Sequence, residues 1–358
     1  MKQNGLIKRI FLFVVAVISV ALVGISSTVS ANQMNFAVIP NLPDNQVDKN
    51  HSYFDLQLDP GQTQTVSVTL RNDTDKDVVV AITMARATTN TSGVVQNSST
   101  SDADVKSKMD KSFANDIVKA VSVPDKQTIP AKSAIEVPVT IKMPDQPFDG
   151  LMAGGLTFKQ TNLKQKESRG QTNIVNQYAY TMGVTLRNNQ AKVTPNLRLS
   201  GVSAKQINYR TTIVATVHNT TPTYINNVAI DGFITKRGSD KKLYKVKIDA
   251  DKHNAGKQIA PQSVYDLPFY LSGDSLKPGK YTLDLTMKSH GHVWHFKQHF
   301  TIVGKQADKL NKTDVDLVKI NWWLIVGILL LILSLILSLL ILMYWLWQKK
   351  RKRDNENN

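Results

Sequence analysis

Hydrophobic and polar residues alternate along most of the chain between residues 53 and 302. The period of two is clearest in the stretches 53–58, 66–70, 78–84, 135–141, 178–186, 213–217 and 281–287. Many of the apolar positions are β-branched, and strict alternation of this kind is typical of half-buried strands in antiparallel sheets. The pattern therefore predicts an all-β protein.

Turn residues such as Asp59-Pro60-Gly61 and Lys277-Pro278-Gly279-Lys280 separate the alternating stretches. Six or seven short strands in each half predict two immunoglobulin-like β-sandwich domains in tandem. We place the first sandwich at 32–160 and the second at 172–305, joined by the hydrophilic connection 161–171. Pro138 lies inside one alternating stretch and predicts an edge strand or a bulge there.

Two short segments of the first half recur loosely in the second. The segment 70–74 (LRNDT) resembles 217–221 (VHNTT), and each closes one strand before another begins. The segment 129–133 (IPAKS) resembles 259–263 (IAPQS), and each precedes a strand. This echo indicates two related sandwiches.

The first residues carry the three parts of a secretory signal. Lysines and an arginine precede an uncharged apolar stretch, 10–25, and the small residues of Val29-Ser30-Ala31 follow. We predict a signal peptide over 1–31 that is cleaved after Ala31. The alternative is an uncleaved N-terminal membrane anchor.

The C-terminal part predicts one transmembrane helix over 320–348. No charged residue occurs between Lys319 and Lys349, and about 20 apolar residues suffice for a helix to cross a bilayer. Tryptophan and tyrosine mark both ends of this stretch, and the basic tail 349–358 marks the cytoplasmic side. The polar segment 306–319 is expected to form a stalk. The protein is thus predicted to be a single-pass protein of the cell membrane, with its ectodomain outside and facing the cell wall.

The net charge of +16 is unevenly distributed. Residues 32–160 contain 12 basic and 15 acidic residues, whereas 161–319 contain 24 and 11. Because the protein is predicted to be exported, nucleic acid is a poor partner for the basic half, and we expect none. Anionic wall polymers, lipid headgroups or an acidic protein fit it better. The chain has no cysteine, which excludes disulfides and thiol chemistry.

A group of glycines follows Phe148 in the sequence FDGLMAGG. Glycine inside a strand marks a bulge or a close approach of the backbone, so the group has two interpretations, a structural bulge and a platform for a ligand. A sugar would favour such a platform together with an aromatic ring. The predicted glycan-binding residues are Tyr53, Phe148, Asp149, Gly150, Gly154 and Gly155.

Eight basic and three acidic residues lie between 236 and 257. Such a run is either a solvated hairpin or a surface that binds an anionic partner. The predicted protein- or anion-binding residues are Lys236, Arg237, Lys241, Lys242, Lys245 and Lys247.

Histidines at 290, 292, 295 and 299 suggest a metal site at first sight. In a strand, however, residues 295 and 299 would lie about 13 Å apart, which is too far to share an ion. No catalytic motif occurs either: there is no G-x-S-x-G elbow, phosphate-binding loop or HExxH pair. We therefore expect no metal, no cofactor and no enzymatic activity.

Several segments resemble the WxL-interacting proteins, a family of Gram-positive surface proteins. The resemblance to the first domain of that family is carried by 53–65 (YFDLQLDPGQTQT), 146–150 (QPFDG) and Gly154-Gly155. The resemblance to the second is carried by 176–180 (NQYAY), 259–263 (IAPQS), 276–281 (LKPGKY) and 294–296 (WHF). Together with the domain order and the terminal helix, it covers nearly the whole chain.

The resemblance implies a binding protein whose first domain binds peptidoglycan and whose second domain binds WxL-domain proteins, as a wall-attached scaffold. The alternative is an adhesin that binds a host or environmental surface. A wall-processing enzyme is a third, weaker hypothesis. Trp322-Trp323-Leu324 spells W-x-L, but it lies at the predicted membrane boundary and is interpreted as an aromatic anchor.

Overall fold

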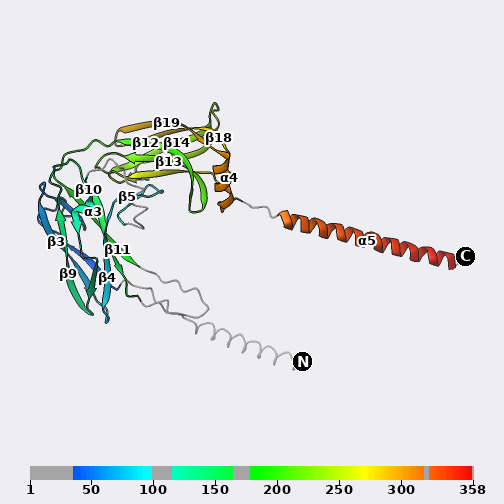
Figure 1. The fold of residues 1–358 in the computed structure, drawn as a ribbon, viewed down its shortest axis with the longest axis horizontal. Coiled ribbons are helices and arrows are strands. Elements are labelled where there is room, and N and C mark those ends of the chain that lie inside the picture. Colours follow the sequence, from blue (N-terminus) through cyan, green and yellow to red (C-terminus); the bar gives the residue numbers. More distant parts are fainter. Residues whose placement is uncertain (1–34, 99–114, 164–177, 318–321, 357–358) are drawn as a thin grey trace, which may run out of the picture.

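The computed structural model describes residues 35–98, 115–163, 178–317 and 322–356. In this part the chain forms two β-sandwiches followed by one long helix (Figure 1). The all-β fold with two immunoglobulin-like sandwiches is therefore confirmed. The predicted signal peptide, 1–31, lies outside the described residues.

The first sandwich packs a four-stranded sheet against a five-stranded one. The four-stranded sheet has the order β1 (Ala37–Asn41), β3 (Thr63–Asn72), β9 (Ser133–Lys142) and β7 (Val121–Ser122), and the five-stranded sheet has the order β2 (Phe54–Gln57), β11 (Ala179–Arg187), β10 (Met152–Gln160), β4 (Val78–Arg86) and β8 (Lys126–Ile129). A short hairpin of β5 (Thr88–Thr89) and β6 (Val95–Gln96) and the single turn α3 (Ile117–Ala120) complete the domain. Strand β9 lies between β3 and β7 and is therefore not the edge strand predicted from Pro138, nor does its pairing with β3 contain a bulge. Proline is tolerated there because β7 pairs only with Thr140 and Ile141, which leaves Pro138 paired with β3 alone in the described sheet.

Strand β11 belongs to the first sandwich, which differs from the boundaries inferred from the sequence. It pairs antiparallel with β10 and parallel with β2, and its side chains Met182, Val184 and Leu186 are buried in the first core. The segment 161–171, expected to connect the domains, therefore lies in the sequence between β10 and β11, which pair within one sheet. Alternation shows that β11 is half-buried, but it carries no information about which sheet receives the strand.

The second sandwich packs a three-stranded sheet against a larger one. The first sheet has the order β12 (Leu197–Ile207), β13 (Arg210–Asn219) and β17 (Val264–Tyr270), and the second has the order β15 (Lys242–Ile248), β14 (Ile225–Lys236), β18 (Gly279–Ser289) and β19 (His292–Ile302), with β16 (Lys257–Ile259) paired to β14. Tyr265, Phe269 and Tyr281 are the largest fully buried side chains of this core.

The sequence similarity between the two halves corresponds to the same asparagine-centred hydrogen-bond pattern in each sandwich. The side chain of Asn72 accepts bonds from the Thr74 N–H and hydroxyl at 2.9 and 2.7 Å and donates to the carbonyl of Ile129 at 3.1 Å. Asn219 accepts from the Thr221 N–H and hydroxyl at 3.1 and 2.7 Å, and it donates to a carbonyl of the other echo segment at 2.9 Å. Both asparagines are fully buried, so each pins two distant segments of its own sandwich.

The predicted stalk is partly folded. Helix α4 (Gly304–Thr313) lies against the second sandwich, where Ala307 is fully buried and Leu310 packs on the core. Beyond it, Arg210 pairs with Asp316 at 2.8 Å. The spacing of Ala307 and Leu310 places both on one face of a helix, which explains why an otherwise polar segment docks.

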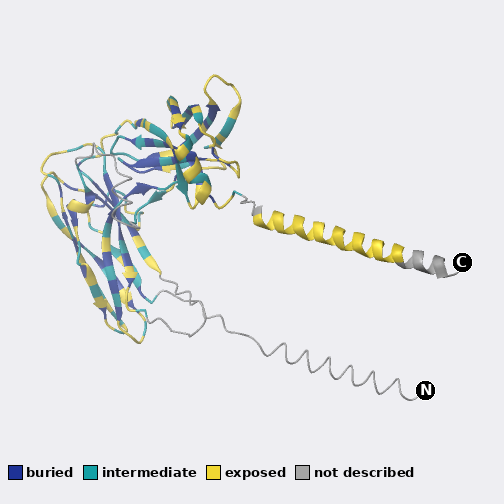
Figure 2. Ribbon diagram, turned by 45° about the vertical axis from the view of Figure 1, so that its right-hand side comes forward, coloured by how far each residue is buried: buried dark blue, intermediate teal, exposed yellow. Residues whose placement is uncertain are grey.

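Helix α5 (Trp322–Glu356) extends away from both sandwiches, and its side chains from Trp323 to Gln348 are exposed (Figures 1 and 2). This stretch is long and apolar enough to cross a membrane. At 1.5 Å per residue its 26 residues extend for about 39 Å, which exceeds the thickness of a bilayer core.

Candidate functional site

The first sandwich carries an open polar groove of about 870 Å³. Its walls come from the segment after β1, from the end of β2 with the turn that follows it, from the start of β3 and from the segment after β11. Eight of its twelve lining residues carry an amide or a carboxylate: Asp44, Asn45, Gln46, Gln57, Asp59, Gln62, Gln64 and Gln190. Polar recognition groups from four separate parts of the chain thus converge on one surface.

The amides of the groove hold one another in position. The side chains of Asn45 and Gln64 exchange two hydrogen bonds, at 2.9 and 3.1 Å, and Asn45 also donates to the carbonyl of Gln57. Gln190 donates to the side chain of Gln57 at 3.2 Å. Each amide has two donors and an acceptor oxygen, so capacity remains for a ligand that both donates and accepts, as sugar hydroxyls and acetamido groups do.

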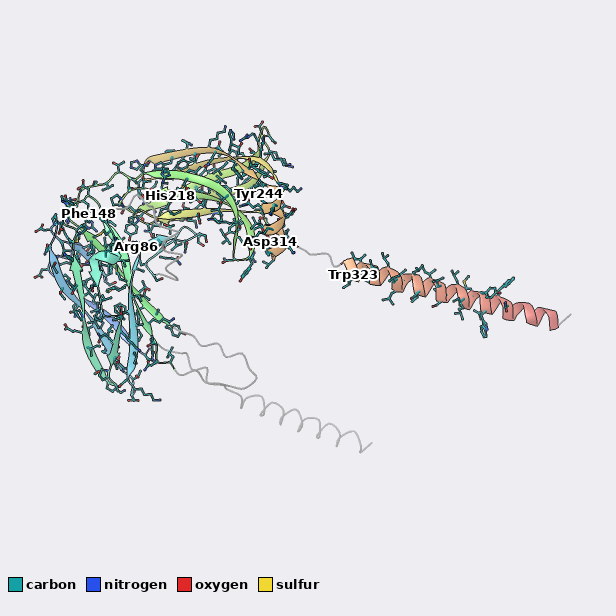
Figure 3. The ribbon with its side chains drawn as sticks, in the orientation of Figure 1. Arg86, Phe148, His218, Tyr244, Asp314 and Trp323 are labelled. Atoms are coloured by element: carbon teal, nitrogen blue, oxygen red, sulfur yellow. The ribbon has the colours of Figure 1, made fainter. Side chains whose placement is uncertain are left out.

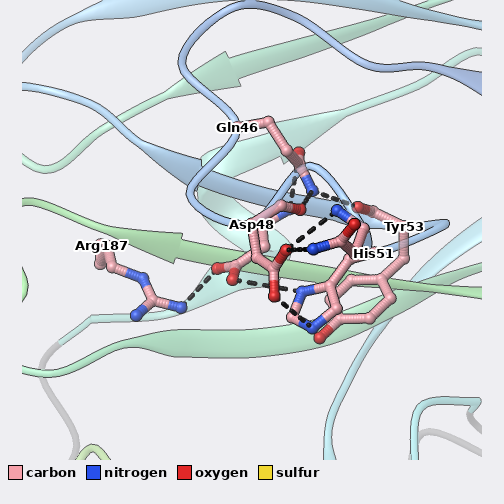
Figure 4. Close-up of polar contacts among 7 residues, drawn as sticks. Gln46, Asp48, His51, Tyr53 and Arg187 are labelled. Carbon is pink, nitrogen blue, oxygen red and sulfur yellow. Dashed lines mark hydrogen bonds and ion pairs between the residues drawn. The ribbon is translucent and has the colours of Figure 1, made fainter.

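A buried network supports one wall of the groove (Figure 4). Gln46 accepts a bond from the N–H of Asp55 at 3.1 Å and donates to the carbonyl of Tyr53 at 2.8 Å, which fixes the loop between them. Asp55 is buried and is paired with Arg187 of β11. The carboxylate is therefore compensated, and the wall is rigid.

The six predicted glycan-binding residues do not form one site. Tyr53 stacks on His51, with ring centroids 4.5 Å apart, and packs on the first core. Gly154 and Gly155 are buried in β10, where a Cβ atom would lie 2.2 Å from the carbonyl oxygen of Ala85 and 2.6 Å from that of Asn97. These two glycines permit close packing of the backbone. The pairing of β10 with β4 and β11 continues through them without a register shift, so the predicted bulge is not present at this point.

The remaining predicted residues, Phe148, Asp149 and Gly150, lie where the first sandwich meets the second. Figure 3 shows Phe148 at this end of the domain, and its N–H donates to the side chain of Asn188 at 3.0 Å. Gly150 has a φ of +84°, and a Cβ atom there would lie 2.3 Å from the carbonyl oxygen of Pro222. Gly150 thus permits contact between the domains, whereas Phe148 packs on the first core and Asp149 accepts a bond from Asn189.

The contact between the domains contains buried polar groups. The hydroxyls of Thr89 and Ser263 are hydrogen-bonded at 2.8 Å, and the N–H of Ala260 donates to Thr89 at 3.0 Å. Tyr224 of the second sandwich enters the same interface and bonds to Thr185 of β11. Burial, and then the nearby Tyr53 and Asp55, raise the pKa of Tyr224 to about 12.

The six predicted protein- or anion-binding residues are all exposed on β14, β15 and the turn between them. Lys242 lies over the ring of Phe233, with 3.9 Å from Nζ to the ring centroid. The structure also brings Lys297 and His299 of β19 to this region, where they line a common hollow with Arg237 and Lys242. The sequence did not relate these two residues to the basic run 236–257, because β19 is a separate, distant strand of the chain.

Among the described residues, no group of three or more histidine, aspartate or glutamate side chains is arranged to hold a metal ion. His295 and His299 instead bond through Nδ1 to Thr286 and Thr282, each at 2.9 Å.

Comparison with protein families gives two matches. Residues 36–160 match the family model described as WxL Interacting Protein, peptidoglycan binding domain. Residues 169–312 match the model described as WxL Interacting Protein, host binding domain. The first description agrees with the implication of the sequence resemblance; the second names host binding, where the resemblance implied binding of WxL-domain proteins.

The search among curated proteins found no match. Solved structures with a similar fold include the CupB2 chaperone of Pseudomonas aeruginosa, which is 11% identical over 68% of this chain and 96% of that chain, with a TM-score of 0.27. The CsuC–CsuE chaperone–tip adhesion subunit complex of Acinetobacter baumannii is 10% identical over 65% of this chain and 90% of that chain, with a TM-score of 0.31.

Proposed function

Because the chain belongs to the WxL-interacting protein family, we propose that it is a membrane-anchored surface protein that binds peptidoglycan with its first domain and a protein partner with its second. The observation that carries this proposal is the amide-lined groove, which lies on the domain matched by the peptidoglycan-binding model. The protein acts by binding and not by catalysis.

The groove suits a glycan chain bearing hydroxyl and acetamido groups. Its amides are already ordered by bonds to one another, so little side-chain entropy is lost when a sugar binds. The carboxylates of Asp44 and Asp59 add acceptors for hydroxyl donors. An open shape admits a polymer along its length, as binding to an intact wall requires.

The test of the first-domain role uses purified sacculi. The double variant Gln57→Ala, Gln190→Ala removes two exposed amides that touch each other across the groove. The matched control, Gln127→Ala with Gln146→Ala, removes two amides of the same domain that do not line it. We expect sedimentation with sacculi to fall about tenfold for the groove variant, from the loss of about 1.4 kcal/mol, and to stay unchanged for the control. Equal binding by both variants would show that the groove is not the site.

For the second domain we propose a WxL-domain protein as the partner, so that the whole protein forms a wall-attached scaffold. A second candidate, an adhesin for a host surface, is favoured by the printed description of the matched family model. Deletion of the gene separates the two: a scaffold loses retention of a WxL-domain protein at the surface, whereas an adhesin loses attachment of intact cells to host material.

The proposed topology places the sandwiches outside the cell and the basic tail inside. The apolar stretch of α5 and the basic residues that follow it support this orientation. Protease added to protoplasts should remove both sandwiches and spare the tail, and the mature chain should begin at Asn32. A mature protein that still begins at Met1 would refute cleavage of the signal peptide.

A further inference from the structure

The outer face of the large sheet in the second sandwich is a continuous basic surface. Side chains alternate along each strand, so the residues that do not enter the core form rows across β15, β14, β18 and β19. The rows are Lys247–Asp231–Thr286–His295, Lys245–Phe233–Asp284–Lys297 and Lys242–Thr235–Thr282–His299. We call this surface the basic face; the exposed Lys288 extends it along β18.

The lysines of the basic face are not neutralised. Within the part of the chain that the structure describes, no ion pair joins Lys242, Lys245, Lys247, Lys288 or Lys297 to a carboxylate. Only two aspartates lie among these five lysines in the rows. On the opposite sheet of the same domain, by contrast, Lys205 is paired with Asp266 at 2.6 Å. The basic face therefore has a net positive charge that is open to a ligand.

The face is hollowed at the end where β14 turns into β15. The hollow has a volume of about 430 Å³, and its cationic lining residues are Arg237, Lys242 and Lys297. The carboxylates of Asp240 and Asp284 and the ordered His299 also line the hollow and add groups that bond to hydroxyls. A ligand that fits this lining carries both anionic groups and hydroxyls.

The chemistry of the face favours a hydrophilic polyanion over a protein. Protein interfaces depend on buried aromatic and aliphatic anchors. Here Phe233 is covered by Lys242, and the exposed apolar side chain next to the rows is Val293, which pairs with Lys288. Lys245 and Lys247 are two residues apart, or about 7 Å, and a row across four strands extends for about 14 Å. Repeated cations at this spacing suit a polymer with regularly repeated anionic groups.

The position of the domain favours a polymer of the bacterium's own envelope. Helix α4 ends at Thr313 and α5 begins at Trp322, so the chain between them extends for at most about 30 Å. If α5 spans the membrane, as the proposed function requires, the second sandwich is held close to the bilayer. A polymer rooted near the membrane reaches it more readily than one carried by another cell.

We propose that the basic face binds a phosphodiester-linked polyol polymer of the cell envelope. Phosphates lie against Lys242, Lys245, Lys247 and Lys297, and polyol hydroxyls bond to Asp284 and the neighbouring threonines. The inference rests on the proposed membrane anchoring, but it concerns a surface separate from the peptidoglycan groove.

The experiment measures binding of purified poly(glycerol phosphate) to the full-length protein in nanodiscs of zwitterionic lipid. The double variant Lys245→Gln, Lys297→Gln removes two charges from the basic face; the matched control, Lys305→Gln with Lys309→Gln, removes two exposed charges of α4. We expect about tenfold weaker binding for the first variant only, equal to about 1.4 kcal/mol, and weaker binding of the unmodified protein at high salt. Equal affinities of the two variants would overturn the proposal.

Two further binding measurements distinguish the proposed polymer from other anionic ligands. Heparin, a sulfated polysaccharide, should bind more weakly than poly(glycerol phosphate), and vesicles of anionic lipid should not compete with the polymer. If heparin binds more tightly or the vesicles compete fully, a host polysaccharide or the membrane is the ligand and the proposal is wrong. Sacculi stripped of phosphodiester polymers should still bind the Lys245→Gln, Lys297→Gln protein, so a failure of the proposed peptidoglycan binding is recognised separately.

Discussion

Removal of β11 should abolish the stability of the first sandwich. A fragment that ends at residue 160 contains every residue matched by the peptidoglycan-binding family model, yet it lacks the strand that lies between β10 and β2. A fragment of residues 35–192 retains this strand. The two fragments therefore test whether the domain ends where the family model ends or where the sheet ends.

The expected loss follows from the buried side chains of β11. Met182, Val184 and Leu186 are at most 8% exposed, and burial of each such side chain contributes about 1.5–3 kcal/mol. Together they account for about 5–9 kcal/mol. In addition, β2 pairs with no other strand of the sheet, so Phe54 and Leu56 lose their support. Since the free energy of unfolding of a domain is typically about 5–15 kcal/mol, the shorter fragment should not fold.

Urea unfolding followed by far-UV circular dichroism distinguishes the fragments. Residues 35–192 should unfold in one cooperative transition, and residues 35–160 should show none. A synthetic peptide of residues 178–192 added to the shorter fragment should restore the transition by inserting as the missing strand. A cooperative transition of 35–160 alone, with the midpoint of 35–192, would refute the assignment of β11 to this sandwich.

Three further predictions concern buried polar groups. Thr89→Val leaves the N–H of Ala260 without its hydrogen bond across the domain interface. The free energy of unfolding should fall by about 1–3 kcal/mol, and hydrogen exchange at that N–H should become faster. The control Thr157→Val, at an exposed threonine pair, should change the free energy of unfolding by less than about 0.5 kcal/mol. Burial raises the pKa of Tyr224 to about 12 from an ordinary 10, so its phenol binds the proton more tightly in the folded state than in the unfolded state. The free energy of unfolding should therefore fall by about 2–3 kcal/mol as the pH rises from 10 to 12. Tyr224→Phe should remove this part of the loss in denaturant titrations at alkaline pH, and an unchanged loss in the variant would contradict the prediction. Asn219→Ala removes four hydrogen bonds from the buried corner of the second sandwich and should lower its calorimetric Tm by at least about 4 °C, a smaller shift being evidence against the corner as a structural support.

The strands were predictable because each is a local pattern. Alternation of apolar and polar residues follows from the opposite directions of successive side chains, and it identified stretches such as 66–70 and 281–287 without any tertiary information. The echo of Asn72 in Asn219 was visible too. The reason for this similarity could not be predicted, because each asparagine forms hydrogen bonds to a segment about forty or more residues away.

The candidate sites were less accessible to prediction. The glycine group was correctly identified as unusual, but the reason for Gly154 and Gly155 is the close approach of neighbouring strands. The groove joins Asn45 to Gln190, and no local pattern relates residues that far apart. The lysines of β15 were identified from their density along the chain, whereas Lys297 joins them only through the pairing of β18 with β19.

The fold class, the apolar C-terminal helix and the membership of the family could be read from the amino-acid sequence. These properties depend on hydrophobic periodicity, on the length of an apolar stretch and on short motifs, which are all contiguous in the chain. Three-dimensional structure was needed to show that β11 completes the first sandwich and that Tyr224 and Thr89 lie in a shared interface. It was also needed to show which polar side chains converge on the groove and the basic face. The physical reason is that strand pairing and domain contact depend on the summed burial and hydrogen bonding of residues from distant parts of the chain, which no single segment encodes.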